Sequence, residues 1–128
     1  MTTQALLQQA KAACPQLAWL GSEEKNQAIY EMADAIIKNT DAILAANAED
    51  LRAAKDTISS VMLDRLRLTE MRIAAMADGM RQVAKLPDPV GEILAEVKRP
   101  NGLVIRKTAV PMGVVAIIYE SRPNVTSD

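Results

Sequence analysis

The hydrophobic pattern of this 128-residue sequence changes at residues 86–91, and that change limits what the chain can fold into. The segment Leu86-Pro87-Asp88-Pro89-Val90-Gly91 contains two prolines and a glycine, which end a helix and mark a connection. Apolar residues recur at helical spacing before this segment, and most of the chain after it has the character of strands. The sequence therefore predicts a helical part followed by a β part.

The helical part is expected to contain five helices. Their expected starts, in order, are Thr3, Ser22, Thr40, Val61 and Thr69. The first should kink or restart at Pro15, which cannot donate a backbone hydrogen bond. The last has the strongest periodicity, and its predicted buried face consists of Ile73, Met76, Ala77, Met80, Val83 and Ala84.

Composition excludes several functional classes. Lys and Arg number 15 against 16 Asp and Glu, so a net charge of −1 argues against a nucleic acid or an anionic membrane as partner. No stretch approaches the roughly 20 apolar residues that cross a bilayer, and the start lacks the features of a signal peptide. We therefore expect a soluble, cytoplasmic protein.

Metal and triad chemistry are also restricted by the residues present. The sequence has no histidine and a single cysteine, so it holds neither a Cys/His zinc site nor a Ser-His-Asp triad, and we expect no metal. Cys14 lies between Ala13 and Pro15, and Lys11 is the only basic residue close to it in the sequence. We expect a buried structural thiol rather than a nucleophile.

The β part predicts a hairpin and one further strand. Residues 93–98 and 103–110 flank Arg99-Pro100-Asn101-Gly102, and Asn-Gly between such runs is a strong hairpin signal. Val114 to Ile118 is a continuous apolar run, as in a strand buried in a parallel sheet. Only ten residues follow it, too few for the crossover to a parallel partner, so the architecture is expected to be incomplete.

The expected fold class is thus α/β, with N-terminal helices, a β-hairpin and the first strand of a parallel sheet. We expect a helical part at 1–92, the hairpin at 93–110 and the start of the sheet at 111–128. Four positive charges on the hairpin fit either an anion site or a solvated strand edge, and we favour the edge. They are Lys98, Arg99, Arg106 and Lys107.

Polar residues that suit catalysis follow the last strand, at the end of a sheet where ligands gather. The guanidinium of Arg122 suits a carboxylate or a phosphate, and the Asn124 amide can donate to an oxygen that gains negative charge. Glu120 can orient either side chain. The alternative is that these residues cap the next helix and pair with each other at the surface. The sequence contains no Gly-x-Gly-x-x-Gly and no P-loop.

Several segments together resemble a known family. They are Leu63-Asp64-Arg65-Leu66-Arg67-Leu68-Thr69, Asp88-Pro89-Val90-Gly91, Val110-Pro111-Met112-Gly113-Val114-Val115 and Ile118-Tyr119-Glu120-Ser121-Arg122-Pro123-Asn124-Val125-Thr126. The chain is similar to the opening of the glutamyl-phosphate reductases of the aldehyde dehydrogenase superfamily, also called glutamate-5-semialdehyde dehydrogenases. The last segment is the most specific.

The resemblance implies an oxidoreductase that reduces L-glutamyl 5-phosphate with NADPH to L-glutamate 5-semialdehyde in proline biosynthesis. In that family a cysteine thiolate forms a thioester that accepts a hydride, and this cysteine lies downstream of the matching region. The resemblance implies a catalytic role for Asn124 and substrate binding by Arg122 and Glu120, and it assigns no residue here to the cofactor. Arg122-Pro123 stands where the superfamily usually has Pro-Trp before that asparagine.

The resemblance also implies that Val114 to Ile118 begins the cofactor-binding sheet and that the hairpin is an arm through which the longer form makes a homo-oligomer. The chain alone is then expected to be inactive. The alternative is a free-standing helical interaction module that uses the hairpin to assemble with partners and has no catalytic activity.

Overall fold

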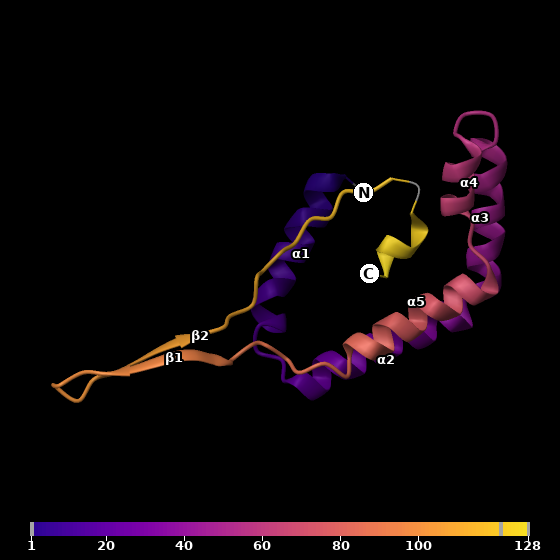
Figure 1. Cartoon of the computed structure of the whole chain (residues 1–128). Coiled ribbons are helices and arrows are strands. Elements are labelled where there is room, and N and C mark those ends of the chain that lie inside the picture. Colours follow the sequence, from indigo (N-terminus) through magenta and orange to yellow (C-terminus); the bar gives the residue numbers. More distant parts are fainter. Residues whose placement is uncertain (1, 121, 128) are drawn as a thin grey trace. The chain divides into compact units, whose positions relative to one another are not determined.

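The computed structural model describes residues 2–120 and 122–127, so Ser121 of the most specific family segment lies outside the described residues. Within these ranges, helices precede a two-stranded antiparallel sheet and a short 3-10 helix, as Figure 1 shows. The elements are α1 (Thr3–Leu17), α2 (Ser22–Lys38), α3 (Thr40–Ala54), α4 (Ser60–Leu66), α5 (Glu70–Val83), β1 (Ile93–Lys98), β2 (Val104–Thr108) and η1 (Pro123–Thr126).

Contacts group the chain into two compact units. The first comprises Met1–Ser22 and Pro87–Ala116, and the second comprises Glu23–Leu86 and Ile117–Asp128. This grouping describes contacts within the chain. The division into 1–92, 93–110 and 111–128 stays a prediction.

In the first unit, α1 begins after Thr2, whose hydroxyl accepts a hydrogen bond from the backbone N–H of Ala5 at 3.3 Å. The helix continues through Pro15 and ends two residues later. None of its residues is buried, and Cys14 is only partly covered. The prediction of a buried thiol was therefore wrong, because α1 has no element of its own unit packed closely over that face.

The predicted hairpin is confirmed. β1 and β2 pair antiparallel, and the turn closes with the N–H of Gly102 donating to the carbonyl of Arg99 at 2.9 Å. Gly102 has a φ of 85°, in the left-handed region that glycine enters without a Cβ clash. The register shifts between Ile93 and Ala95, which marks a bulge near the start of β1.

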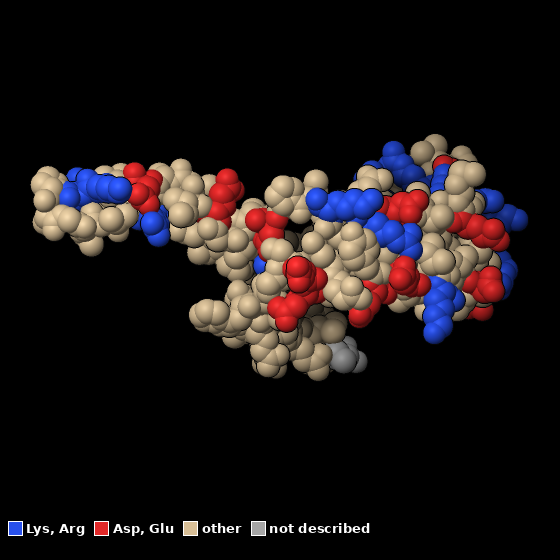
Figure 2. Space-filling view, turned by 90° about the horizontal axis from the view of Figure 1, so that it is seen from below, with Lys and Arg blue, Asp and Glu red and all other residues tan. Residues whose placement is uncertain are grey.

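Both faces of the hairpin are exposed along its full length. Glu96 and Arg106 lie opposite each other and form an ion pair at 2.7 Å. The four positive side chains named above are exposed, as expected for a solvated strand edge. Figure 2 shows charges of both signs interspersed on the visible face, with no large patch of one sign.

The strand predicted at Val114 to Ile118 does not form in this chain. The structure assigns no strand to these residues, and Val115, Ile117 and Ile118 are 60%, 62% and 98% exposed. The physical reason is that a strand exists through hydrogen bonds to a neighbour, and the described residues offer none to this run. The segment has the apolar composition of a strand, but no second strand among the described residues forms hydrogen bonds with it.

In the second unit, α3 contacts both α4 and α5, and η1 contacts α5. Helices α2 and α5 lie side by side in Figure 1, joined by an ion pair between Arg81 and Asp34 at 2.7 Å. Arg81 also pairs with Asp78 at 3.0 Å. These two carboxylates, Asp34 first, raise the pKa of Arg81 above its ordinary value by hydrogen bonding to the charged guanidinium.

The helix starts in this unit are close to prediction. Thr69 caps α5 as expected, its hydroxyl accepting from the N–H of Arg72 at 3.2 Å. Thr40 is instead the first residue of α3, and its hydroxyl donates to the carbonyl of Ile37 at 2.8 Å. Ser22, predicted as a cap and grouped with the first unit, is the first residue of α2, and its hydroxyl donates to Asp88 of the first unit at 3.1 Å.

The core of the described residues is small and is built from short side chains. Its buried apolar members are Ala33, Ile73, Ala77 and Ala84. Three of these lie on the predicted face of α5, so the periodicity of that helix identified its buried side correctly, while Val83 on the same face is 57% exposed. One polar side chain, Asn47 on α3, is buried with them at 5% exposure.

Candidate functional site

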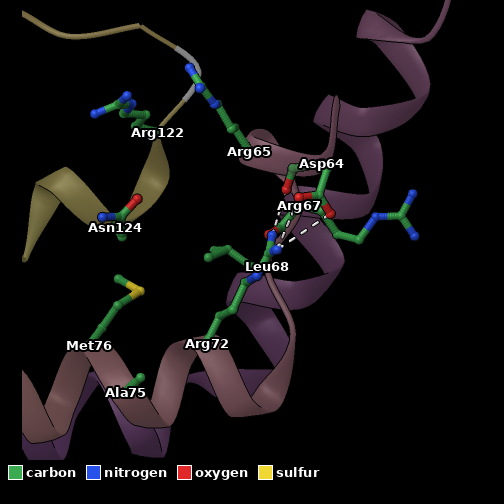
Figure 3. A pocket seen from close by; sticks show the side chains of 9 residues that line it. All are labelled: Asp64, Arg65, Arg67, Leu68, Arg72, Ala75, Met76, Arg122 and Asn124. Atoms are coloured by element: carbon green, nitrogen blue, oxygen red, sulfur yellow. Dashed lines mark hydrogen bonds and ion pairs between the residues drawn. The ribbon is translucent and has the colours of Figure 1, made fainter. Parts of the chain in front are cut away.

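A pocket of about 540 Å³ lies in the second unit, between the α4–α5 connection and the residues around η1. Figure 3 shows the side chains that line it. They are Asp64, Arg65, Arg67, Leu68, Arg72, Ala75, Met76, Arg122 and Asn124. Four arginines and one aspartate are among these residues, so the lining carries a clear excess of positive charge.

Arg72 is already engaged with its own chain. Its guanidinium donates to the backbone carbonyls of Asp64 and Arg67, the latter at 2.6 Å, and pairs with the Asp64 carboxylate at 3.3 Å. The two carbonyls belong to the end of α4, where helical hydrogen bonding stops and acceptors need other donors. Arg72 thus holds the α4–α5 connection and is neutralised by Asp64.

Two other arginines are available to a ligand. The guanidinium groups of Arg65 and Arg122 make no hydrogen bond or ion pair with a residue in the ranges 2–120 and 122–127. In Figure 3 the Arg65 side chain extends toward the segment that carries Arg122 and Asn124, whereas that of Arg67 points away from it. Among the arginines that line the pocket, Arg65 and Arg122 are therefore the ones we consider for binding a ligand.

The predicted site residues are only partly brought together. Arg122 precedes η1 and Asn124 lies within it, and both line the pocket from the side opposite α5. Glu120 is exposed and is not among the lining residues. The packing of η1 against α5 and a hydrogen bond of 2.7 Å between the hydroxyls of Tyr119 and Thr126 fix this segment.

The alternative reading of these residues as a cap for a following helix does not fit this segment. Arg122 occupies the N-cap position of η1 without a side-chain capping bond. The carbonyl of Asn124 accepts from the backbone N–H of Ser127 at 2.9 Å and from its hydroxyl at 2.7 Å, so Ser127 closes the turn. Arg122 and Asn124 are both among the residues that line the pocket (Figure 3).

The arrangement suits an oxyanion. Guanidinium groups bind carboxylate and phosphate through paired donors, and a primary amide adds a donor toward an oxygen that gains charge. The pocket is open and Arg122 and Asn124 are exposed, so solvent screens each interaction, and several donors together are needed for useful affinity. The lining fits a small anionic molecule.

Sequence reasoning missed Arg65 and Arg72 as pocket residues. Both lie more than 45 positions before Arg122 in the sequence, and only folding brings α4 and α5 to η1. The segment from Leu63 to Thr69 was one of those that resemble the family, and its closely spaced arginines were the available signal.

A nicotinamide cofactor does not fit the lining of this pocket. None of the nine lining residues is aromatic or glycine, and the sequence has no glycine-rich dinucleotide turn. Cys14 belongs to the first unit and is not a lining residue. We therefore assign no residue of this chain to NADPH and no nucleophile.

Comparison with known proteins shows what the chain is similar to. The chain is 53% identical over 124 residues to a gamma-glutamyl phosphate reductase of Carboxydothermus hydrogenoformans, covering 96% of this chain and 30% of the relative. It is 55% identical over 128 residues to that of Koribacter versatilis, covering 100% of this chain and 31% of the relative. The chain matches the N-terminal part of the gamma-glutamyl phosphate reductases. It spans about 30% of the length of these curated relatives.

Solved structures agree with the sequence comparison. A gamma-glutamyl phosphate reductase from Thermotoga maritima matches with a TM-score of 0.90 at 37% identity, over 94% of this chain and 29% of that one. The enzyme from Saccharomyces cerevisiae matches with a TM-score of 0.90 at 33% identity, over 99% of this chain and 33% of that one. The expected α/β fold class is thus confirmed. No family model matches the chain. Within the described residues, no helix is long and apolar enough to span a membrane.

Proposed function

We propose that this chain forms the N-terminal part of a reductase that converts L-glutamyl 5-phosphate to L-glutamate 5-semialdehyde with NADPH, releasing phosphate, in proline biosynthesis. Similarity over nearly the whole chain to proteins named for this substrate supports the proposal. The observation that carries it is the pocket that Arg65, Arg122 and Asn124 line together. An acyl phosphate with an α-carboxylate is the kind of anion that such a lining binds.

Each site residue receives a role under this proposal. Arg122 binds an anionic group of the substrate through its two outer nitrogens. The Asn124 amide donates to the acyl oxygen, which gains negative charge when a nucleophile adds to the carbonyl carbon. The carbonyl then re-forms as the bond to phosphate breaks and phosphate leaves with the bonding pair. Glu120, two positions from Arg122 and exposed, is proposed to orient the guanidinium when substrate is present.

NADPH, when bound, supplies the hydride. The residues of this chain act on the other reactant, because they hold and orient the anionic substrate and stabilise the oxyanion. Since we assign no described residue as the nucleophile or to the cofactor, we predict that the chain has no reductase activity alone and that a cytoplasmic, longer polypeptide carries the activity.

The hairpin is proposed to be the arm through which that longer polypeptide forms a homo-oligomer. Apolar side chains along it are about half exposed, among them Ile93 at 51%, Val97 at 49% and Ile105 at 47%. An isolated two-stranded hairpin is marginally stable in water and gains stability when its faces are covered. A positive charge introduced on this strand by Val97→Lys should lower the oligomeric mass measured by sedimentation.

The experiment that tests the proposed function begins with the native polypeptide. An antibody raised against residues 1–86 identifies it in the source cell, and its mass is compared with the 13.9 kDa of this chain. The purified polypeptide is then assayed for NADPH oxidation with L-glutamyl 5-phosphate. A mass several times larger with this activity supports the proposal, and a long form without the activity contradicts it.

A native mass near 13.9 kDa would favour the second candidate, a free-standing interaction module. The exposed hairpin is the observation that favours it, because an uncovered apolar strand pair needs a partner. A closed oligomer of the short chain that unfolds cooperatively would then support assembly without catalysis.

A further inference from the structure

Asn47 is the only polar side chain that is buried among the described residues, and it does not line the pocket. It lies on α3, with an exposure of 5%. Its amide nitrogen donates to the carbonyl of Leu66 at 2.9 Å, and its amide oxygen accepts from the N–H of Leu68 at 2.7 Å. One side chain therefore binds the backbone on both sides of Arg67, where α4 ends.

The same short segment is held from α5 as well. Arg72 binds the carbonyls of Asp64 and Arg67, so residues 64–68 are fixed from two helices by side-chain hydrogen bonds. Arg65 lies within this segment and lines the pocket, and its side chain extends toward the segment that carries Arg122 (Figure 3). The direction of Arg65 is consequently set by a backbone that Asn47 and Arg72 hold in place.

We propose that Asn47 is a positioning residue that aims Arg65 into the pocket, and that Arg65 is a second arginine for the oxyanion of the substrate. This inference rests on the proposed function. An apolar residue would fill the same buried position between helices without the need for paired partners, whereas an amide bonded to a specific N–H and a specific carbonyl fixes one backbone geometry. Arg122, which directly precedes η1, lines the same pocket, and Arg65 is proposed to join it in binding one anion.

The oxyanion has two sources in the substrate, the phosphoryl group and the α-carboxylate. The reverse reaction separates them, because glutamate 5-semialdehyde, phosphate and NADP+ are then added as independent reactants and the rate of NADPH formation is measured. The KM for phosphate reports on the phosphoryl site. The KM for the semialdehyde reports on the carboxylate site.

The test uses the full-length polypeptide that carries this sequence, with the variants Asn47→Ala, Arg65→Met and the double variant. Arg65→Met should raise one of the two KM values by at least about tenfold, the change expected for loss of one good ionic contact, with kcat changing much less. Asn47→Ala should raise the same KM by a similar factor. The double variant should be no worse than Arg65→Met, because both changes remove one interaction.

A matched control and a conservative variant separate positioning from general destabilisation. Asp34→Asn weakens the ion pair between α2 and α5 in the same unit and should leave both KM values unchanged. Asn47→Asp keeps the acceptor for Leu68 but sets an oxygen against the Leu66 carbonyl, so its KM defect should lessen at low pH, where a protonated carboxyl donates again. This variant is isosteric and carries the test if Asn47→Ala does not fold.

The possible outcomes are distinct. A rise confined to the KM for phosphate assigns Arg65 to the phosphoryl group. A rise confined to the KM for the semialdehyde assigns Arg65 to the α-carboxylate. Either result supports the inference. Unchanged KM values in the Arg65 or Asn47 variants, or effects that add fully in the double variant, overturn it. An unsubstituted full-length polypeptide without reductase activity refutes the proposed function instead.

Discussion

Arg72 is predicted to hold the end of α4 in place, and its removal should open this connection locally. The ion pair with Asp64 is largely exposed, at 45% and 69% for the two side chains, so it contributes only about 0.2–1 kcal/mol. The two bonds to backbone carbonyls come from a charged donor, a class worth about 1.5–3 kcal/mol each when buried. Since Arg72 is partly exposed and water can replace part of these bonds, each falls below that range to about 1 kcal/mol, and with the ion pair we expect about 2–3 kcal/mol in total for Arg72→Ala.

The assay is hydrogen exchange at the backbone N–H of Leu68, which leaves its bond to Asn47 only when the connection opens. A loss of about 2–3 kcal/mol corresponds to exchange about 30 to 150 times faster, at 1.36 kcal/mol per tenfold change. Arg72→Lys keeps the positive charge but lacks the planar fork, so it should show roughly half of this effect in free energy. The N–H of Arg99, in the hairpin turn of the other unit, serves as the internal control.

Unchanged exchange at Leu68 in Arg72→Ala would refute the role of Arg72 in holding the connection. Equal exchange in Arg72→Lys and in the unsubstituted protein would show that charge alone, without the guanidinium geometry, is sufficient. Faster exchange at Arg99 to the same extent would indicate general destabilisation, which contradicts a local effect.

Three further predictions concern packing, the turn and pH. Ile73 is the largest fully buried side chain, so Ile73→Ala should destabilise the second unit by about 2–5 kcal/mol and Ile73→Val by about 0.5–1.5 kcal/mol, measured by urea unfolding. Gly102→Ala should cost about 1–2 kcal/mol because the φ of 85° places a Cβ in the left-handed region, and faster amide exchange in the turn would show it. Asp34 and then Asp78 raise the pKa of Arg81 in the folded protein above its value in the unfolded chain. The two ion pairs therefore contribute their full stability below the unfolded pKa of Arg81, and this stability is lost only as pH rises through the higher folded pKa. Thermal unfolding of Asp34→Asn and of the unsubstituted protein should therefore differ by the same amount throughout about pH 6 to 9, and a difference that changes across this range would contradict the assignment.

The helices and the hairpin were predictable because their determinants are local. Apolar spacing identified the buried face of α5, including Ile73 and Ala77, and Thr69 was recognisable as its cap. Asn-Gly marked the hairpin turn at Gly102. In each case the residues that determine the structure lie within a few positions of one another, so their pattern can be recognised in the sequence.

The run from Val114 to Ile118 shows where local reasoning ends. Its apolar composition is typical of a buried strand, yet strand formation depends on a neighbour that lies elsewhere. Without one among the described residues, the run is exposed and carries no ladder. The apolar pattern indicates that this segment can be a buried strand, but it does not identify the neighbouring strand to which the segment would hydrogen-bond.

Only part of the candidate site could be predicted from the sequence. Arg122 and Asn124 were identified because polar groups follow an apolar run, and both line the pocket. Arg65 and the positioning residue Asn47 come from α4 and α3, and their roles depend on tertiary hydrogen bonds that no spacing rule contains. Glu120 was selected by its place in the motif alone, and its role stays a proposal.

The most direct test of the central claim is an exchange of segments with the Koribacter versatilis relative, which is 55% identical over 128 residues. This chain replaces the matching segment of that protein, and the chimera is assayed for NADPH oxidation with L-glutamyl 5-phosphate. We expect the chimera to have activity within about tenfold of the parent. Asn124→Ala in the chimera should lower this activity by about 100-fold or more, as for removal of an oxyanion donor. A folded chimera of the parent's oligomeric mass that lacks activity, or full activity in Asn124→Ala, would contradict the claim.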